Sequence, residues 1–208
     1  MDLSRSENLV DPKKLPQKVA IIGCGAIGSH VAICIAAMGV PEIILFDGDV
    51  VAEENLSPAG FFQWQIGAPK VEALAELVKG KNPQCVVRTE GNYFNQSIVA
   101  DIVFIAVDSL KVRQDIASML GRWNIHLLAD LRMGDTLLSQ YTFVGDEISK
   151  YPGMLEGEST SELPCGNKAT AFICYLSAFF AGGLVYDWAN EKKPTFEKFA
   201  DGHTRDMI

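Results

Sequence analysis

The chain has 208 residues, of which 48% are hydrophobic and 21% charged, and its formal net charge is −8 at pH 7. This length and composition are typical of one soluble globular domain whose core needs no disulfide bonds. The excess of acidic residues argues against broad electrostatic binding to nucleic acid or to an anionic membrane. We therefore expect no nucleic acid and no membrane among the partners.

The two ends of the chain are polar. Residues 1–18 carry several charges and do not fit a secretory signal peptide, so we interpret them as an N-terminal arm. Residues 19–190 are the expected domain, and residues 191–208 the expected C-terminal tail. The five cysteines are scattered and include no Cys-x-x-Cys pair, which favours reduced thiols, a cytoplasmic protein and no structural zinc.

Residues 169–186 form the longest apolar stretch, with nearly the length of a membrane span. The stretch contains polar and small residues, among them Thr170 and Tyr175, and an acidic segment follows it. We interpret it as a buried helix at the end of the domain, because the length is marginal for a span.

Residues 19–47 predict a nucleotide-binding βαβ unit. The unit begins with an apolar strand at residues 19–22, a Gly-x-Gly-x-x-Gly turn at 23–28 and a helix at 29–38. A second strand follows at residues 42–46, and the acid Asp47 ends it. This order is typical of a site for an adenine nucleotide or a dinucleotide. The alternative is an α/β protein whose glycine turn binds nothing.

The glycines of this turn have separate roles. Gly23 permits the tight turn, Gly25 lets a phosphate approach the backbone, and Gly28 lets the helix pack close to the strand. Free N–H groups at the helix start then attract an anion. We expect the nucleotide to lie against the turn and Asp47 to bind the ribose hydroxyls; the turn residues are Gly23, Gly25, Ala26, Ile27 and Gly28.

More candidate ligands follow at later strand ends and helix starts. Ligands of open α/β sheets bind beyond the carboxyl ends of the strands, where Asp47 and Asp49 fall. Lys70 lies in the first turn of a helix that Pro69 starts, and a cation there opposes the helix dipole, which makes it a candidate phosphate contact. Asp108 follows another strand and is either a ligand or part of a helix start.

The rest of the chain extends the same fold. We expect further strands at residues 85–88, 101–107, 125–130 and 136–144, the last antiparallel at the edge. A surface loop should occupy residues 145–164, and Cys165 begins the next helix, where the helix dipole can lower a thiol pKa. The sequence therefore predicts an α/β, Rossmann-like, mostly parallel sheet with helices on both faces and an antiparallel edge extension.

Four motifs in this order resemble the MoeB, ThiF and HesA family, whose adenylation domain is shared with ubiquitin-activating enzymes. The resemblance covers residues 17–120 and is weaker beyond. It rests on the glycine turn, on Asp47-Gly48-Asp49-Val50 with Asn55-Leu56, on Ile66-Gly67-Ala68-Pro69-Lys70, and on Asp108 with Arg113.

This resemblance implies a function. Family members bind ATP with Mg²⁺ and adenylate the C-terminal glycine carboxylate of a small ubiquitin-like or sulfur-carrier protein. It implies that Asp47 and Asp49 lie at the nucleotide, that Asn55 and Lys70 bind the phosphates, and that Asp108 binds Mg²⁺. It also implies a homodimer in which Arg5 reaches the partner subunit's site, and a thiol transfer through Cys165.

The chain departs from the family pattern after Asn55. The family has Asn-Leu-x-Arg-Gln, whereas this chain has Asn55-Leu56-Ser57-Pro58-Ala59 and lacks the arginine that contacts the triphosphate. Two alternatives stay open: an NAD-dependent oxidoreductase, and a non-catalytic scaffold of the same family that binds a nucleotide or a partner. Lys70 and Asp108 favour ATP over NAD.

Overall fold

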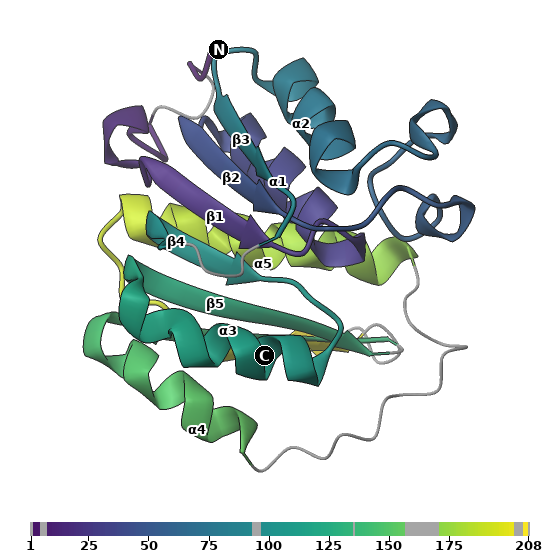
Figure 1. Ribbon diagram of the computed structural model, residues 1–208. Coiled ribbons are helices and arrows are strands. Elements are labelled where there is room, and N and C mark those ends of the chain that lie inside the picture. The colour runs from purple at the N-terminus through teal and green to yellow at the C-terminus, as the bar shows by residue number, and fades with distance from the viewer. Residues whose placement is uncertain are drawn as a thin grey trace.

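A computed structural model describes residues 2–4, 8–92, 97–134, 136–156, 171–201 and 206–207. These residues form an eight-stranded sheet in the order β3-β2-β1-β4-β5-β6-β7-β8, with helices on both of its faces (Figure 1). The pairs from β3 to β5 are parallel, and those from β5 to β8 are antiparallel. The predicted Rossmann-like sheet with an antiparallel extension is confirmed.

The parallel part of the sheet follows the sequence prediction closely at its start. Its strands are β1 (Lys18–Ile22), β2 (Glu42–Phe46), β3 (Val86–Glu90), β4 (Val99–Ile105) and β5 (Asn124–Gly134). Strand β5 continues four residues beyond Asp130, where the prediction ended it. The reason is that Asp130 is fully buried and paired with two arginines, so its charge does not have to face solvent.

The antiparallel part contains β6 (Leu137–Val144), β7 (Glu197–Asp201) and β8 (Asp206–Met207). The prediction that residues 136–144 lie at the sheet edge is wrong, because β7 pairs with β6 and β8 pairs with β7. Both outer strands lie within the expected tail at residues 191–208. Their charged sequence, with Ala200 the one fully buried residue of β7, does not have the apolar pattern of a strand. The domain boundary at residue 191 stays a prediction.

Two helical layers cover the sheet. Helices α1 (Ala26–Met38), α2 (Lys70–Lys81) and α5 (Ala171–Ala189) pack on one face, and α3 (Leu110–Met119) and α4 (Tyr151–Leu155) pack on the other. Helix α4 occupies part of the segment expected as a surface loop, and that part of the prediction is wrong because Tyr151 and Leu155 belong to the core. Short 3₁₀ helices span Pro12–Lys14, Glu53–Asn55, Gln63–Gln65, Leu120–Arg122 and Gly145–Lys150.

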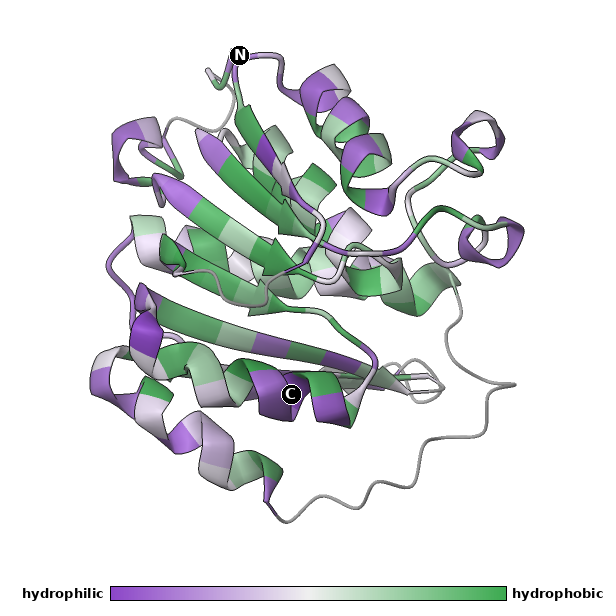
Figure 2. Ribbon diagram, in the orientation of Figure 1, coloured by the Kyte–Doolittle hydropathy of each residue, from purple (hydrophilic) through white to green (hydrophobic). Residues whose placement is uncertain are grey.

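Helix α5 is hydrophobic along most of its length (Figure 2). By length and composition alone, it is the one helix of the described residues that could cross a membrane. Its inner side packs in the core that also contains α1, through residues such as Ile173, Phe180 and Leu184. Its outer side exposes Phe172, Tyr175 and Phe179, each by more than half. The helix therefore forms a layer of the domain and presents an exposed aromatic face.

Candidate functional site

The glycine turn joins β1 to α1 beside the end of β4. Gly23 has a φ of 95°, and a Cβ atom there would lie 2.6 Å from the carbonyl oxygen of Ala106. A Cβ atom on Gly28 would lie 1.8 Å from the carbonyl oxygen of Gly23. Neither position can hold a larger residue without a backbone shift, so the turn is as tight as its sequence indicates.

Gly25 lies in a different environment from the other two glycines. A Cβ atom on Gly25 would meet no described heavy atom within 4 Å, and Gly25 is the N-cap of α1, which begins three residues earlier than predicted. The first N–H groups of a helix have no partner within the helix itself, and no described side chain caps them here. Because the Ile27 side chain is buried, backbone groups are what this turn can offer an anion.

Asp47 links the glycine turn to the loop after β2. Its Oδ2 accepts a hydrogen bond from the backbone N–H of Cys24 at 2.7 Å, and its Oδ1 accepts one from the N–H of Asp49 at 2.8 Å. The carboxylate is half-buried and lies at the carboxyl edge of the sheet. These bonds orient it next to the turn, where a ribose hydroxyl could reach it.

The chain between Asp49 and Lys70 leaves the sheet and returns to the same point. The backbone N–H of Val51 donates to the carbonyl oxygen of Ala68, and the backbone N–H of Lys70 donates to the carbonyl oxygen of Asp49 at 2.9 Å. This closure brings the Lys70 ammonium to 2.8 Å from Oδ2 of Asp49. The side chain of Lys70 is 11% exposed, whereas that of Asp49 is 73% exposed. The Lys70 side chain is therefore held by the surrounding protein, whereas the Asp49 side chain faces solvent.

Lys70 is the centre of a group of charged residues. Burial lowers the pKa of Lys70, but the hydrogen bond to Asp49 and the charges of Asp47, Asp49 and Asp108 outweigh burial and raise that pKa above its usual value. Lys70 therefore lies within electrostatic reach of Asp47, Asp49 and Asp108. These four residues come from three separate sequence motifs. With three carboxylates and one ammonium, the group carries an excess of negative charge.

This excess bears on which ligand fits. A triphosphate alone would add negative charge to a site that already has too much of it, whereas a triphosphate with a divalent cation would not. No group of three metal-ligating side chains occurs among the described residues, so a cation here would depend on Asp108, phosphate oxygens and water. That is the usual ligand set of Mg²⁺ at a nucleotide. The residues present fit ATP with Mg²⁺.

Asp108 lies in the short connection between β4 and α3. The strand ends at Ile105, two residues before the predicted end, and Ser109 caps α3 by accepting a hydrogen bond from the N–H of Val112. Asp108 itself is exposed. Since the cap is supplied by Ser109, the carboxylate of Asp108 remains for a ligand.

Three predicted site residues are less well placed by the structure. Asn55 lies in a 3₁₀ turn, and its Oδ1 accepts a hydrogen bond from the N–H of Ala52 at 3.0 Å. Arg5 and Cys165 lie outside the described residues, so their roles stay predictions. Pro58 occupies the place of the absent family arginine, and its carbonyl oxygen accepts a hydrogen bond from Nε2 of His30 at 3.0 Å, which holds this loop against α1.

Residues 61–64 contain three aromatic side chains, of which one is buried and two are exposed. Phe61 is 5% exposed and packs in the core, whereas Phe62 and Trp64 are 47% and 71% exposed and stack on each other at 4.4 Å between ring centroids.

Asp130 is not among the site residues predicted from the sequence, although it is fully buried on β5 close to α3. It pairs with Arg113 and Arg132 and accepts a hydrogen bond from Tyr151. Burial, together with the charge of Asp130, raises the pKa of Tyr151, so its hydroxyl stays a donor. Only Arg132 lies near Asp130 in the sequence, whereas Arg113 is 17 residues away, so no local pattern marks this network.

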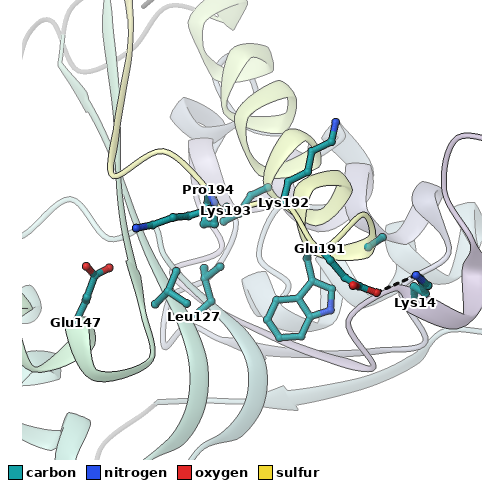
Figure 3. Close-up of a pocket in the computed structure, with 11 residues that line it drawn as sticks. Lys14, Leu127, Glu147, Glu191, Lys192, Lys193 and Pro194 are labelled. Carbon is teal, nitrogen blue, oxygen red and sulfur yellow. Dashed lines mark hydrogen bonds and ion pairs between the residues drawn. The ribbon is translucent and has the colours of Figure 1, made fainter.

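A cavity of about 750 Å³ opens beside the C-terminal end of α5 (Figure 3). Leu127, Leu184 and Trp188 form its apolar wall, and Lys193 and Glu147 point into it from different sides. None of the predicted site residues that the structure describes lines this cavity. Leu127 lies in the amino-terminal half of β5, so the cavity is at the opposite end of the strand from the nucleotide site.

Comparisons with known proteins place the chain in a family. The family model of the ThiF family matches residues 11–129. The tRNA threonylcarbamoyladenosine dehydratase of Haemophilus influenzae is 29% identical, and the match covers 84% of this chain and 86% of that protein. Ubiquitin-like modifier-activating enzyme 5 of Drosophila mojavensis is 37% identical over 45% of this chain, and SAMP-activating enzyme E1 of Haloferax volcanii is 32% identical over 43%.

The relatives differ in length. The matches cover only 23% and 33% of the two activating enzymes. The crystal structure of E. coli MccB with ATP has a TM-score of 0.74 to this chain at 18% identity, over 95% of this chain and 64% of MccB. The family match covers more than half of the chain and includes the glycine turn, Asp47, Lys70 and Asp108. The chain belongs to the ThiF family of E1-like adenylating enzymes.

Proposed function

We propose that this protein binds ATP with Mg²⁺ and adenylates the carboxylate of another molecule. The observation that carries the proposal is the buried Lys70, bonded to Asp49 at 2.8 Å and within electrostatic reach of Asp47 and Asp108. The open space in front of Gly25 and the first turn of α1, which has no side-chain cap among the described residues, support a phosphate site there.

In the proposed reaction, a carboxylate oxygen of the acceptor attacks the α-phosphorus of ATP. The bond from that phosphorus to the bridging oxygen breaks, and an acyl-adenylate and pyrophosphate form. An ionised carboxylate is already a nucleophile, so no side chain of this protein has to remove a proton. The protein binds and orients: Asp47 holds the ribose, α1 holds phosphate oxygens, and Lys70 stabilises the charge of the departing pyrophosphate.

Asp108 is the proposed Mg²⁺ ligand. The cation supplies positive charge to the phosphate oxygens when it is bound, and it offsets the three carboxylates around Lys70. Asn55 would contact the triphosphate with its amide nitrogen, because its amide oxygen already bonds to Ala52.

The proposed acceptor is a small ubiquitin-like or sulfur-carrier protein that ends in glycine. The names of two relatives, ubiquitin-like modifier-activating enzyme 5 and SAMP-activating enzyme E1, support this choice. We further propose a cytoplasmic homodimer in which Arg5 reaches the partner subunit's site and Cys165 receives the acyl group as a thioester. The exposed rings of Phe62, Trp64 and α5 provide apolar surface for protein contacts.

A tRNA nucleoside is the second candidate acceptor. The relative whose match covers more than four-fifths of both chains is named a tRNA threonylcarbamoyladenosine dehydratase. The net charge of −8 weighs against tight tRNA binding. A mobility-shift titration with total tRNA separates the two acceptors, since a protein substrate predicts no shift at physiological salt.

Calorimetric titration with ATP, with and without Mg²⁺, tests the proposal, with NAD as a parallel ligand. We expect Mg²⁺ to strengthen ATP binding at least about tenfold in the wild type, and to have no such effect in Asp108→Ala. Asp115→Ala is the matched control, because Asp115 lies on α3 and pairs only with the exposed Lys111 among the described residues. Binding of NAD without ATP would favour the oxidoreductase, and binding of neither would favour the scaffold.

A further inference from the structure

A buried charge network lies under the connection that carries Asp108. Asp130 is fully buried on β5. Its Oδ1 accepts a hydrogen bond from Nε of Arg113 at 3.0 Å, and its Oδ2 accepts bonds from Nε of Arg132 at 2.7 Å and from the hydroxyl of Tyr151 at 3.1 Å. One carboxylate thus joins β5 to α3 and to α4.

Packing alone does not explain this network. The surrounding core is apolar and contains Ile105, Ile116, Leu128 and Phe143. Buried ion pairs are weak contributors to net stability, because desolvation offsets much of their attraction, and apolar residues of similar volume often replace them without loss. What a buried pair with fixed hydrogen-bond geometry does provide is a defined relative position of the elements that it joins.

Arg113 fixes α3, the helix that follows Asp108, relative to β5. Its Nε bonds to Asp130 and its Nη2 donates to the carbonyl oxygen of Leu131 at 3.2 Å, so α3 is held to β5 at two points. The backbone N–H of Arg113 donates to the carbonyl oxygen of Ser109, which places Arg113 one helical turn after Ser109, the residue that follows Asp108. The side chain is almost fully buried, so its position is fixed.

The start of the connection is held by the main chain of the same residue, Asp130. Asp130 is the register partner of Ile105, the last residue of β4, and Asp108 lies three residues further on. The segment from Ile105 to Ser109 is therefore held at its start by the sheet register and at its end by Arg113. Both restraints meet at Asp130.

We propose that Arg113 and Asp130 are positioning residues that hold the Asp108 carboxylate at the nucleotide site. This inference rests on the proposed function, because it assigns the effect to the Mg²⁺ ligand of that site. Tyr151 joins Asp130 to α4 and not to α3, so its hydroxyl has no part in the placement of Asp108. That difference supplies a matched control.

The test compares Arg113→Lys with Tyr151→Phe. Lysine keeps the positive charge but cannot make the two-point contact, whereas Tyr151→Phe removes one hydrogen bond of the same carboxylate. We expect Arg113→Lys to weaken the Mg²⁺-dependent part of ATP binding about tenfold, as loss of an orienting partner of a metal ligand typically does, and to leave Mg²⁺-free ATP binding within about twofold. Tyr151→Phe should leave both quantities within about twofold.

A double-mutant cycle separates positioning from a general structural effect. If Arg113 acts through Asp108, then adding Arg113→Lys to Asp108→Ala should cause no further loss of Mg²⁺-dependent ATP binding. Additive losses would overturn the inference, and so would an Arg113→Lys protein with the full Mg²⁺ effect. Thermal unfolding of each variant confirms that a folded protein is titrated, and Asp130→Asn provides a second route to the same loss.

The two proposals fail in different ways. A wild-type protein without Mg²⁺-dependent ATP binding refutes the proposed function, and the positioning role with it. A wild-type protein with that effect, together with an unaffected Arg113→Lys variant, refutes the positioning role alone.

Discussion

The parallel and antiparallel parts of the sheet differ in what their strand ends bring together. Parallel strands all end at the same edge, as β1, β2 and β4 do (Figure 1). The glycine turn, Asp47 and Asp108 follow these three strands in the chain and therefore lie at that edge. Antiparallel neighbours end at opposite edges, and β6, β7 and β8 therefore cannot gather consecutive strand ends into one site.

The family match follows the same division. It covers residues 11–129, which include β1 to β4 and end within β5, just before Asp130. The antiparallel part closes the core on the side of α4, where Phe143 packs on Tyr151 and Phe196. The difference predicts that changes in the parallel part affect nucleotide binding, whereas changes in the antiparallel part affect stability.

Phe143→Ala should have the largest effect. It should lower stability and leave ATP binding unchanged. Phe143 is 2% exposed and lies 5.5 Å from the ring of Tyr151 and 5.3 Å from that of Phe196. Its truncation should lower the free energy of unfolding by about 3–5 kcal/mol. The folded fraction should bind ATP within about twofold of the wild type. Urea unfolding followed by calorimetry measures both quantities.

The neighbouring residue provides the control for that experiment. Val144 is 38% exposed at the end of β6, and Val144→Ala should change the free energy of unfolding by less than about 1 kcal/mol. A Phe143→Ala protein that is folded but binds ATP much more weakly would contradict the division between the two parts.

The elements of the parallel part could be predicted because local sequence and position agree there. Strand β2 has the predicted bounds, and α2 begins at Lys70 after Pro69 as expected. Apolar runs bounded by glycine, proline and acids mark buried parallel strands well. The presence of Asp47, Lys70 and Asp108 in one site also follows from the family motifs.

The remaining features depend on contacts that no local pattern contains. The end of β5 could not be predicted, because Asp130 stays inside the core only through its pairing with Arg113 and Arg132. Strand β7 has the composition of a polar tail and becomes a strand by pairing with β6. The ion pair between Lys70 and Asp49 depends on the closure of the loop between them.

Lys70→Met should have the next largest effect, on the parallel side. Methionine fills the same buried space without the charge, and the lost partner Asp49 is 73% exposed, so stability should change by less than about 1 kcal/mol. Affinity for ATP with Mg²⁺ should fall at least about 30-fold, because a desolvated cation that faces phosphate typically contributes 2 kcal/mol or more. Calorimetry measures the affinity.

Lys79→Met is the matched control, since Lys79 is exposed in the last turn of the same helix. It should bind ATP as the wild type does. Equal losses in both variants would indicate a general charge effect, and no loss in Lys70→Met would remove the central observation of the proposed function.

The smallest predicted effect is a pH dependence of stability that comes from α1. Burial lowers the pKa of His30, and the hydrogen bond to the Pro58 carbonyl oxygen offsets this only in part. The folded protein therefore binds a proton at His30 less readily than the unfolded chain, whose histidine pKa is about 6.5. The stability that neutral His30 provides is fully present above that value and is lost as the pH falls through the lower, folded pKa.

His30→Gln should remove this contribution. We expect the difference in the free energy of unfolding between wild type and His30→Gln to shrink from pH 7 to about pH 5. Urea unfolding at both pH values measures the change. An unchanged difference would contradict the prediction, because it would mean that the pKa of His30 is the same in the folded and the unfolded protein.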